Sequence, residues 1–113
     1  MALAACGGTS APAETLPADL SLTVKAVPSL KFDAAEYGPV KAGEVTIGYV
    51  NEDSVRHTLI LAKDDTKVPA FKLVIAENGS VDSGAVTLEA GTYKLLCDVP
   101  GHSNMKATLT VTP

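Results

Sequence analysis

The chain has 113 residues with a formal net charge of −4, and 46% of its residues are hydrophobic. This length supports a single core and therefore one folded domain. The acidic balance offers no basic stripe for phosphates, which argues against a nucleic-acid partner. No apolar run approaches the roughly 20 residues of a membrane-spanning helix.

The first segment is expected to attach the domain to a membrane. Residues 3–6 read Leu-Ala-Ala-Cys, which resembles a bacterial lipobox, the motif whose cysteine is lipidated and becomes the mature N-terminus. Because only five residues precede Cys6, we expect the full-length form to carry a longer signal segment. The alternative is a chance cysteine in a disordered tail.

A tether is expected to follow the lipobox remnant. Residues 7–19 are mostly Gly, Thr, Ser, Ala, Pro and Glu and have little to bury. We therefore interpret residues 1–19 as lipobox remnant and flexible tether, and residues 20–113 as the folded domain. Membrane attachment through lipidated Cys6 would place that domain outside the cytoplasmic membrane, in the periplasm or at the cell surface.

From residue 20 onward, the sequence predicts short strands and no substantial helix. Alternating apolar residues indicate half-buried strands, and turn residues separate them. Residues 33–37 allow at most a helical turn, Gly38-Pro39 marks a bend, and the charged residues 63–67 suggest a solvated turn. Strands are predicted at 20–27, 30–32, 44–50, 57–62, 71–75, 81–88, 93–98 and 107–111. Seven or eight such strands favour an all-β, Greek-key sandwich.

The loop between the last two strands carries the chemistry. Cys97, His102 and Met105 lie within nine residues of one another, with a predicted strand on each side. Two strands can fix the position of such a loop. A cysteine and a methionine alone would more often be simple core residues, so this motif is weak evidence by itself.

His57 strengthens the argument, because it is one of only two histidines and begins a predicted strand. In a sandwich, its loop and the Cys97 loop can meet at the same end. Two imidazoles and a thiolate with a weak axial thioether are the ligands of blue copper sites. Zinc also binds two histidines and a cysteine. The thioether of Met105 favours copper, because it is a soft ligand.

The segments at residues 91–106 and 50–59 resemble the two ligand segments of the cupredoxins, the type 1 blue copper proteins. The similarity is greatest to the plastocyanin, auracyanin and sulfocyanin group. It covers roughly residues 20–113 and is specific only in those two segments. The resemblance implies a Greek-key sandwich that binds one copper ion, Cu(I) or Cu(II), per chain. The implied copper ligands are His57, Cys97, His102 and Met105.

The sequence departs from the family pattern in three places. Four residues separate Cys97 from His102 and two separate His102 from Met105, a spacing that matches neither plastocyanin-like nor sulfocyanin-like loops. Thr58 stands where many members have asparagine, and we expect it to hydrogen-bond to Asp98 and so fix the ligands. Arg56 precedes the first histidine, where a cation near the axial side would favour Cu(I) and raise the reduction potential.

The resemblance implies a small one-electron carrier. It would exchange electrons with redox proteins such as cytochromes or copper oxidases and reductases, as a monomer outside the cytoplasm. The electron would leave through His102, within an apolar patch that includes Val99, Pro100 and Gly101.

Three alternatives remain at this stage. A protein that binds or delivers copper as cargo is the main one, although the chain has only two methionines. An enzyme is not expected, because both histidines are used as ligands and no Gly-x-Ser-x-Gly motif occurs. The third alternative is an adhesion domain with a β-sandwich fold, in which Cys97 is simply a buried core residue.

Overall fold

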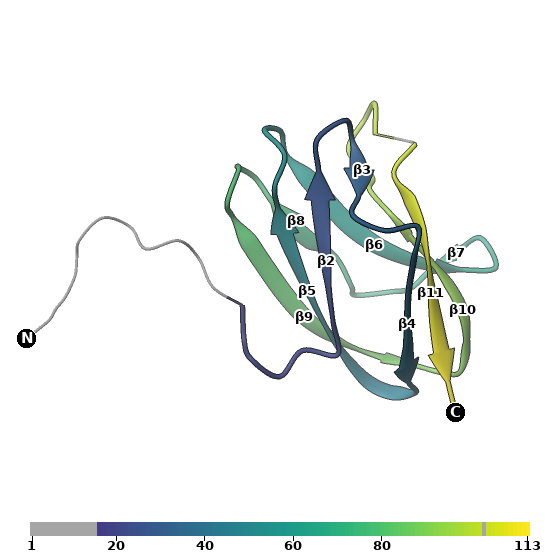
Figure 1. The fold of residues 1–113 in the computed structure, drawn as a ribbon. Helices are drawn as coiled ribbons and strands as arrows, with labels where there is room; N and C mark the ends of the chain where they lie inside the picture. Colours follow the sequence, from purple (N-terminus) through teal and green to yellow (C-terminus); the bar gives the residue numbers. More distant parts are fainter. Residues whose placement is uncertain (1–15, 103) are drawn as a thin grey trace, which may run out of the picture.

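Two mixed β-sheets pack face to face in the computed structural model, which describes residues 16–102 and 104–113 (Figure 1). Cys6 and most of the predicted tether lie outside the described residues. Within these ranges the chain forms strands and no helix, so no helix there could cross a membrane. The strands are β2 (Leu22–Val27), β3 (Lys31–Phe32), β4 (Glu36–Lys41), β5 (Gly43–Asn51), β6 (His57–Lys63), β7 (Thr66–Lys67), β8 (Leu73–Ile75), β9 (Val81–Leu88), β10 (Gly91–Leu96) and β11 (Lys106–Thr112).

The core lies between the two sheets, and strand alternation explains why. One sheet has the order β4-β11-β10-β6-β7, with β8 also paired to β6, and the other has the order β3-β2-β5-β9. Successive side chains of a strand point to opposite faces, so every second residue enters the core. The inward residues include Ile47, Tyr49, Leu95 and Leu109, all buried. The prediction of an all-β sandwich is confirmed.

Strand β4 corrects the expectation for residues 33–39, because residues from Glu36 onward pair with β11 in parallel instead of forming a helical turn and a bend. The pairing shifts from Tyr37↔Leu109 to Val40↔Val111, so Gly38 and Pro39 face a single residue. Such a β-bulge at a sheet edge accommodates a proline, which has no N–H to donate. Glycine is required beside it, because Gly38 has φ +92° and a Cβ there would lie 2.7 Å from a backbone oxygen.

Strand β7 is a second difference, because the charged residues 63–67 form the end of a hairpin. Ala62 pairs with Lys67, and Lys63 pairs with Thr66. Asp64 and Asp65 between them have φ of 52° and 65°, as a type I′ turn requires. This segment from Asp64 to Lys67 is exposed, as the charges indicate.

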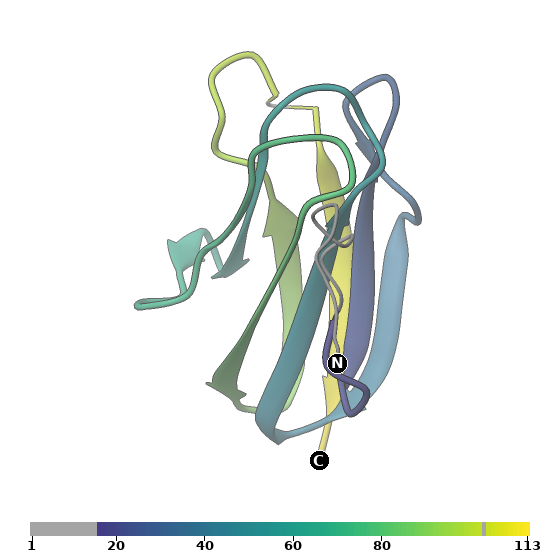
Figure 2. The same cartoon turned by 90° about the vertical axis from the view of Figure 1, so that its left-hand side faces the viewer.

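Four loops gather at one end of the sandwich, the end opposite the C-terminus (Figures 1 and 2). They are the loops after β2, β5, β8 and β10. The loop after β5 leads to His57, and the loop after β10 contains Cys97 and His102. The topology therefore brings together two segments that lie about forty residues apart in the sequence.

Candidate metal centre

The loop after β10 is shaped by a tight turn that its sequence specifies. The His102 N–H donates to the Val99 carbonyl at 3.0 Å, which closes a four-residue turn. Pro100 occupies the second position, and Gly101 occupies the third with φ +89°, the pattern of a type II turn. The Met105 N–H then donates to the His102 carbonyl at 3.0 Å. The loop backbone thus positions both side chains.

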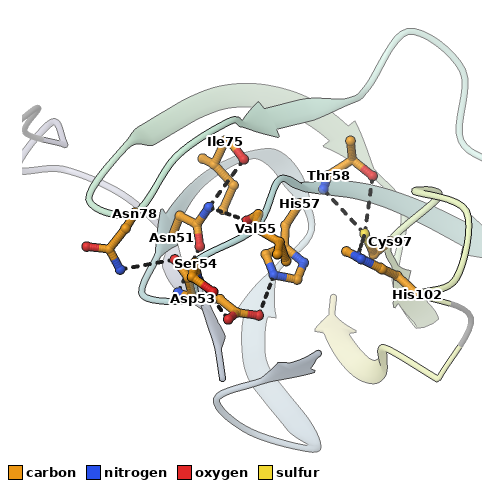
Figure 3. Close-up of polar contacts among 10 residues, drawn as sticks. All are labelled: Asn51, Asp53, Ser54, Val55, His57, Thr58, Ile75, Asn78, Cys97 and His102. Carbon is orange, nitrogen blue, oxygen red and sulfur yellow. Dashed lines mark hydrogen bonds and ion pairs between the residues drawn. The ribbon is translucent and has the colours of Figure 1, made fainter. Parts of the chain in front are cut away.

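Three potential ligand atoms converge where this loop meets the start of β6 (Figure 3). The atoms offered by His57, Cys97 and His102 all lie within 4.8 Å of one another. Cys97 Sγ is 3.5 Å from His102 Nδ1. The exposed fractions are 0% for His57, 7% for Cys97 and 8% for His102, while Met105 is 1% exposed. The structure therefore brings all three together in a site shielded from water.

Thr58 joins the two ligand segments. Its hydroxyl donates to Asp98 Oδ1 at 2.5 Å, and the Asp98 N–H donates back to Thr58 Oγ at 2.9 Å. The Thr58 N–H also donates to Cys97 Sγ at 3.4 Å, which stabilises negative charge on the sulfur. The hydrogen bond from Thr58, and more weakly Lys72 at 3.0 Å from Asp98 Oδ2, lower the pKa of Asp98 despite partial burial.

On the other side of the site, a carboxylate holds His57. Asp53 Oδ2 lies 2.8 Å from His57 Nε2. The Ser54 N–H donates to Asp53 Oδ1 at 2.7 Å, the Asp53 N–H donates to Asn51 Oδ1 at 2.9 Å, and the Asn78 side chain donates to the Asp53 carbonyl at 3.0 Å (Figure 3). The loop after β5 is therefore built around Asp53.

Asp53 is ionised at neutral pH. Burial acts to raise the pKa of its carboxyl, but hydrogen bonds from His57 and from the Ser54 amide outweigh that effect, so the pKa lies below its ordinary value. An ionised carboxylate can only accept hydrogen bonds. In neutral His57, the ring proton therefore sits on Nε2, and Nδ1 carries a free lone pair.

The unpartnered Nδ1 of His57 tests whether a metal fits here. This atom is buried and has no hydrogen-bond partner within the described residues. Leaving a buried polar atom unsatisfied costs about 1–3 kcal/mol, so such atoms need an explanation. A metal ion bound by His57, Cys97 and His102 would satisfy it. Two imidazoles and a thiolate near a buried thioether are a donor set for copper.

The other predicted residues lie around this centre. Arg56 is exposed and lines a groove with Lys72 and Pro100. Val99 is half-buried, whereas Pro100 and Gly101 are exposed beside His102. Cys6, the predicted lipidation site, lies outside the described residues.

Asp53 and Asn51 were not predicted as part of the site. The sequence placed both in a polar loop without a role. The only available signals were an aspartate four residues before a histidine and the Asn-x-Asp pattern of a side-chain turn, and neither is diagnostic alone.

Comparisons with solved structures support the same interpretation. Auracyanin A, a "blue" copper protein from Chloroflexus aurantiacus, is 27% identical over 80% of this chain and 96% of its own, with a TM-score of 0.66. Reduced auracyanin from Roseiflexus castenholzii is 19% identical over 86% and 100%, with a TM-score of 0.71. A purple cupredoxin from Nitrosopumilus maritimus is 19% identical over 83% and 100%, with a TM-score of 0.62.

No family model matches the chain, and no match was found among curated proteins. The structural similarity and the site carry the assignment instead. The similar structures include auracyanins and a purple cupredoxin, and the ligand atoms of His57, Cys97 and His102 converge beside a buried Met105. The chain therefore has the cupredoxin fold, with these four residues positioned as a copper site.

Proposed function

We propose that this chain is a small one-electron carrier that uses one type 1 copper ion. One observation carries the proposal: the ligand atoms of His57, Cys97 and His102 lie within 4.8 Å of one another, in a buried site where His57 Nδ1 has no other partner. Similarity to auracyanin A, described as a blue copper protein, supports it. We expect no enzymatic activity.

The ligand roles follow from the donor atoms. His57 Nδ1, Cys97 Sγ and His102 Nδ1 would be the strong ligands of the copper ion, and the Met105 thioether would be a weaker fourth ligand. Bound copper would supply a couple between Cu(I) and Cu(II). The turn at His102 and the hydrogen bonds of Thr58 hold the protein side of the site in one geometry. A fixed ligand set reorganises little, which favours fast electron transfer.

The electron is proposed to enter and leave through His102. At 8% exposed, its side chain is nearer to solvent than that of His57, which is fully buried. Val99, Pro100 and Gly101 directly precede it in the loop, and Pro100 and Gly101 are exposed, so these residues would offer an apolar contact surface. Partner redox proteins, such as cytochromes or copper oxidases and reductases, would dock on this patch.

We further propose that the exchange takes place outside the cytoplasm. The support is the lipobox-like sequence at residues 3–6 and the short polar segment after it. Lipidated Cys6 would hold the domain at the membrane surface as a monomer. Metabolic labelling of the full-length protein with a lipid probe would test this, and labelling that persists in Cys6→Ser would contradict it.

The central test is to add Cu(II) to the purified protein and record its visible spectrum. We expect an intense thiolate-to-copper charge-transfer band, because Cys97 is the only cysteine among the described residues. Cys97→Ser should abolish the band, while Met105→Leu should keep it and raise the reduction potential. A wild-type protein without this band would overturn the proposal.

A second measurement separates a carrier from a protein that delivers copper. A carrier retains its metal in both oxidation states. We therefore expect Cu(I) to remain bound through repeated oxidation and reduction in the presence of a Cu(I) chelator. Rapid transfer of Cu(I) to the chelator would favour delivery.

A further inference from the structure

We infer that Asp53 is a positioning residue of the copper site: its carboxylate fixes the tautomer and orientation of His57 and lowers the reduction potential of the bound metal. The effect on the reduction potential rests on the proposed function, whereas the positioning of His57 applies to the metal-free protein as well.

The contact is direct and buried. Asp53 Oδ2 lies 2.8 Å from His57 Nε2, and the two residues are 7% and 0% exposed. Since the carboxylate accepts a hydrogen bond from Nε2–H, Nδ1 keeps its lone pair and is the ligand atom that faces Cys97 and His102 (Figure 3). A metal-binding histidine commonly gives its other N–H to a carboxylate or a carbonyl, and this partner sets ring orientation and ligand basicity.

The carboxylate is held in place independently of His57. The Ser54 N–H donates to its other oxygen at 2.7 Å, and Asn51 and Asn78 bind the Asp53 backbone at 2.9 Å and 3.0 Å. Asn51 is itself anchored, because its Nδ2 donates to the Val55 carbonyl at 2.8 Å. Asp53 is thus preorganised to orient the ring.

Unlike Asp98, Asp53 pairs with no lysine or arginine among the described residues. Asp98 lies beside the Cys97 loop, but its side chain is 33% exposed and pairs with Lys72 at 3.0 Å. Among the described residues, His57 is the only ion-pair partner of Asp53. A buried carboxylate acts through a low dielectric, so it stabilises the more highly charged Cu(II) state over Cu(I). The expected consequence is a lower potential.

The test uses two variants and one matched control. Asp53→Asn keeps the size and an oxygen acceptor but removes the charge, while Asp53→Ala removes both. Asp64→Asn is the control, because it makes the same chemical change at an exposed turn residue whose φ of 52° asparagine also tolerates.

Two readouts are expected to change. In the metal-free protein, ¹⁵N NMR should show wild-type His57 protonated at Nε2, and Asp53→Ala should lose this preference. The affinity of Asp53→Ala for Zn(II), measured by chelator competition, should fall about 10–100-fold. In the copper-loaded protein, Asp53→Asn should raise the reduction potential relative to both wild type and Asp64→Asn.

The inference is overturned if Asp53→Ala keeps the wild-type tautomer and Zn(II) affinity, or if Asp53→Asn has the same potential as the control. Should Asp53→Ala fail to fold, the potential of Asp53→Asn decides. Wild-type protein without a charge-transfer band would reject the proposed carrier function, while the NMR and Zn(II) measurements would still test the positioning role.

Discussion

The two histidines occupy the same site but are held in different ways. His57 is fully buried, and a side-chain network of Asp53 and Asn51 surrounds its outer nitrogen. His102 is 8% exposed and is positioned by the backbone of its own loop, through the turn from Val99 to His102. His57 is therefore suited to anchor a metal, and His102 is suited to the role in electron exchange proposed above.

Because of this difference, we expect substitutions near the two histidines to affect the stability of the fold and the properties of the site to different degrees. Interactions around His57 link the loop after β5 to the loop after β8, since Asn51 and Asn78 both contribute. Interactions around His102 are short-range in sequence. Substitutions near His57 should therefore lower the free energy of unfolding and also disturb the metal site, whereas substitutions near His102 should affect mainly the metal site.

The largest contrast is expected between His57→Gly and His102→Gly. His57→Gly leaves a cavity and removes the partner of a buried carboxylate, which should cost about 3 kcal/mol of unfolding free energy. His102→Gly should cost about 1 kcal/mol or less. Urea denaturation of the metal-free proteins measures both values. Equal losses of unfolding free energy would contradict the proposed difference between the two histidines.

The same pair should differ in chemical rescue. Added imidazole can reach the gap left by the more exposed His102, so it should restore the charge-transfer band of copper-loaded His102→Gly. It should not restore that of His57→Gly, whose gap is closed off from solvent. The measurement is an absorbance titration of each copper-loaded variant with imidazole. Recovery of the band in both variants would show that the two positions are equally accessible.

The next contrast is between two asparagines. Asn51 is 1% exposed and uses both ends of its amide, donating to Val55 and accepting from Asp53. Asn51→Ala should therefore lower the unfolding free energy by about 2–3 kcal/mol. Asn104→Ala, at an exposed position of the His102 loop, should change it by no more than about 0.5 kcal/mol. Thermal unfolding would reveal any departure from this order.

Lowering the pH should reduce the stability of the fold more through Asp53, beside His57, than through Asp98. The folded-state pKa values of Asp53 and Asp98 both lie below their ordinary value. The unfolded state therefore binds more protons in this range, so each group stabilises the fold above about pH 4 and loses that contribution as pH falls toward its folded pKa.

Asp98 is one-third exposed, so solvent screening reduces its effect. We expect Asp53→Asn to flatten the acid limb of the stability curve of the metal-free protein more than Asp98→Asn does. Urea denaturation at a series of pH values below 5 checks this. A steeper flattening in Asp98→Asn would reverse the comparison.

A smaller effect than at Asn51 is expected at Thr58, where the two ligand segments meet. Thr58→Val keeps the shape but removes the hydroxyl bonded to Asp98, which should cost about 1 kcal/mol. The backbone N–H of residue 58 still reaches Cys97 Sγ, so the charge-transfer band should shift but persist. Loss of the band would show that the hydroxyl, and not the backbone, fixes the sulfur.

Local patterns explain what the sequence could predict. The sequence pattern predicted a strand within residues 81–88, the segment that forms β9, and the Pro100-Gly101 pair indicated the turn before His102. The approach of His57 to Cys97 followed from the expectation that two loops meet at one end of a sandwich.

Other features depend on contacts that no local pattern reveals. β4 forms only because β11 is available beside it, and residues 33–39 alone look like a bend. Asp53 belongs to the site only because the network around Asn51 folds its loop back toward His57. An aspartate in a polar loop is usually a solvated charge, so its local context alone did not single it out.

The bulge in β4 bears on how the molecule behaves at high concentration. β4 is an outer strand of the larger sheet, and an outer strand can template pairing with another chain. Pro39 presents no donor to such a chain, and the extra residue opposite Thr110 disturbs the regular ladder. This edge is therefore protected against strand-to-strand aggregation, which would suit the proposed carrier, since such a protein has to bind and release partners repeatedly.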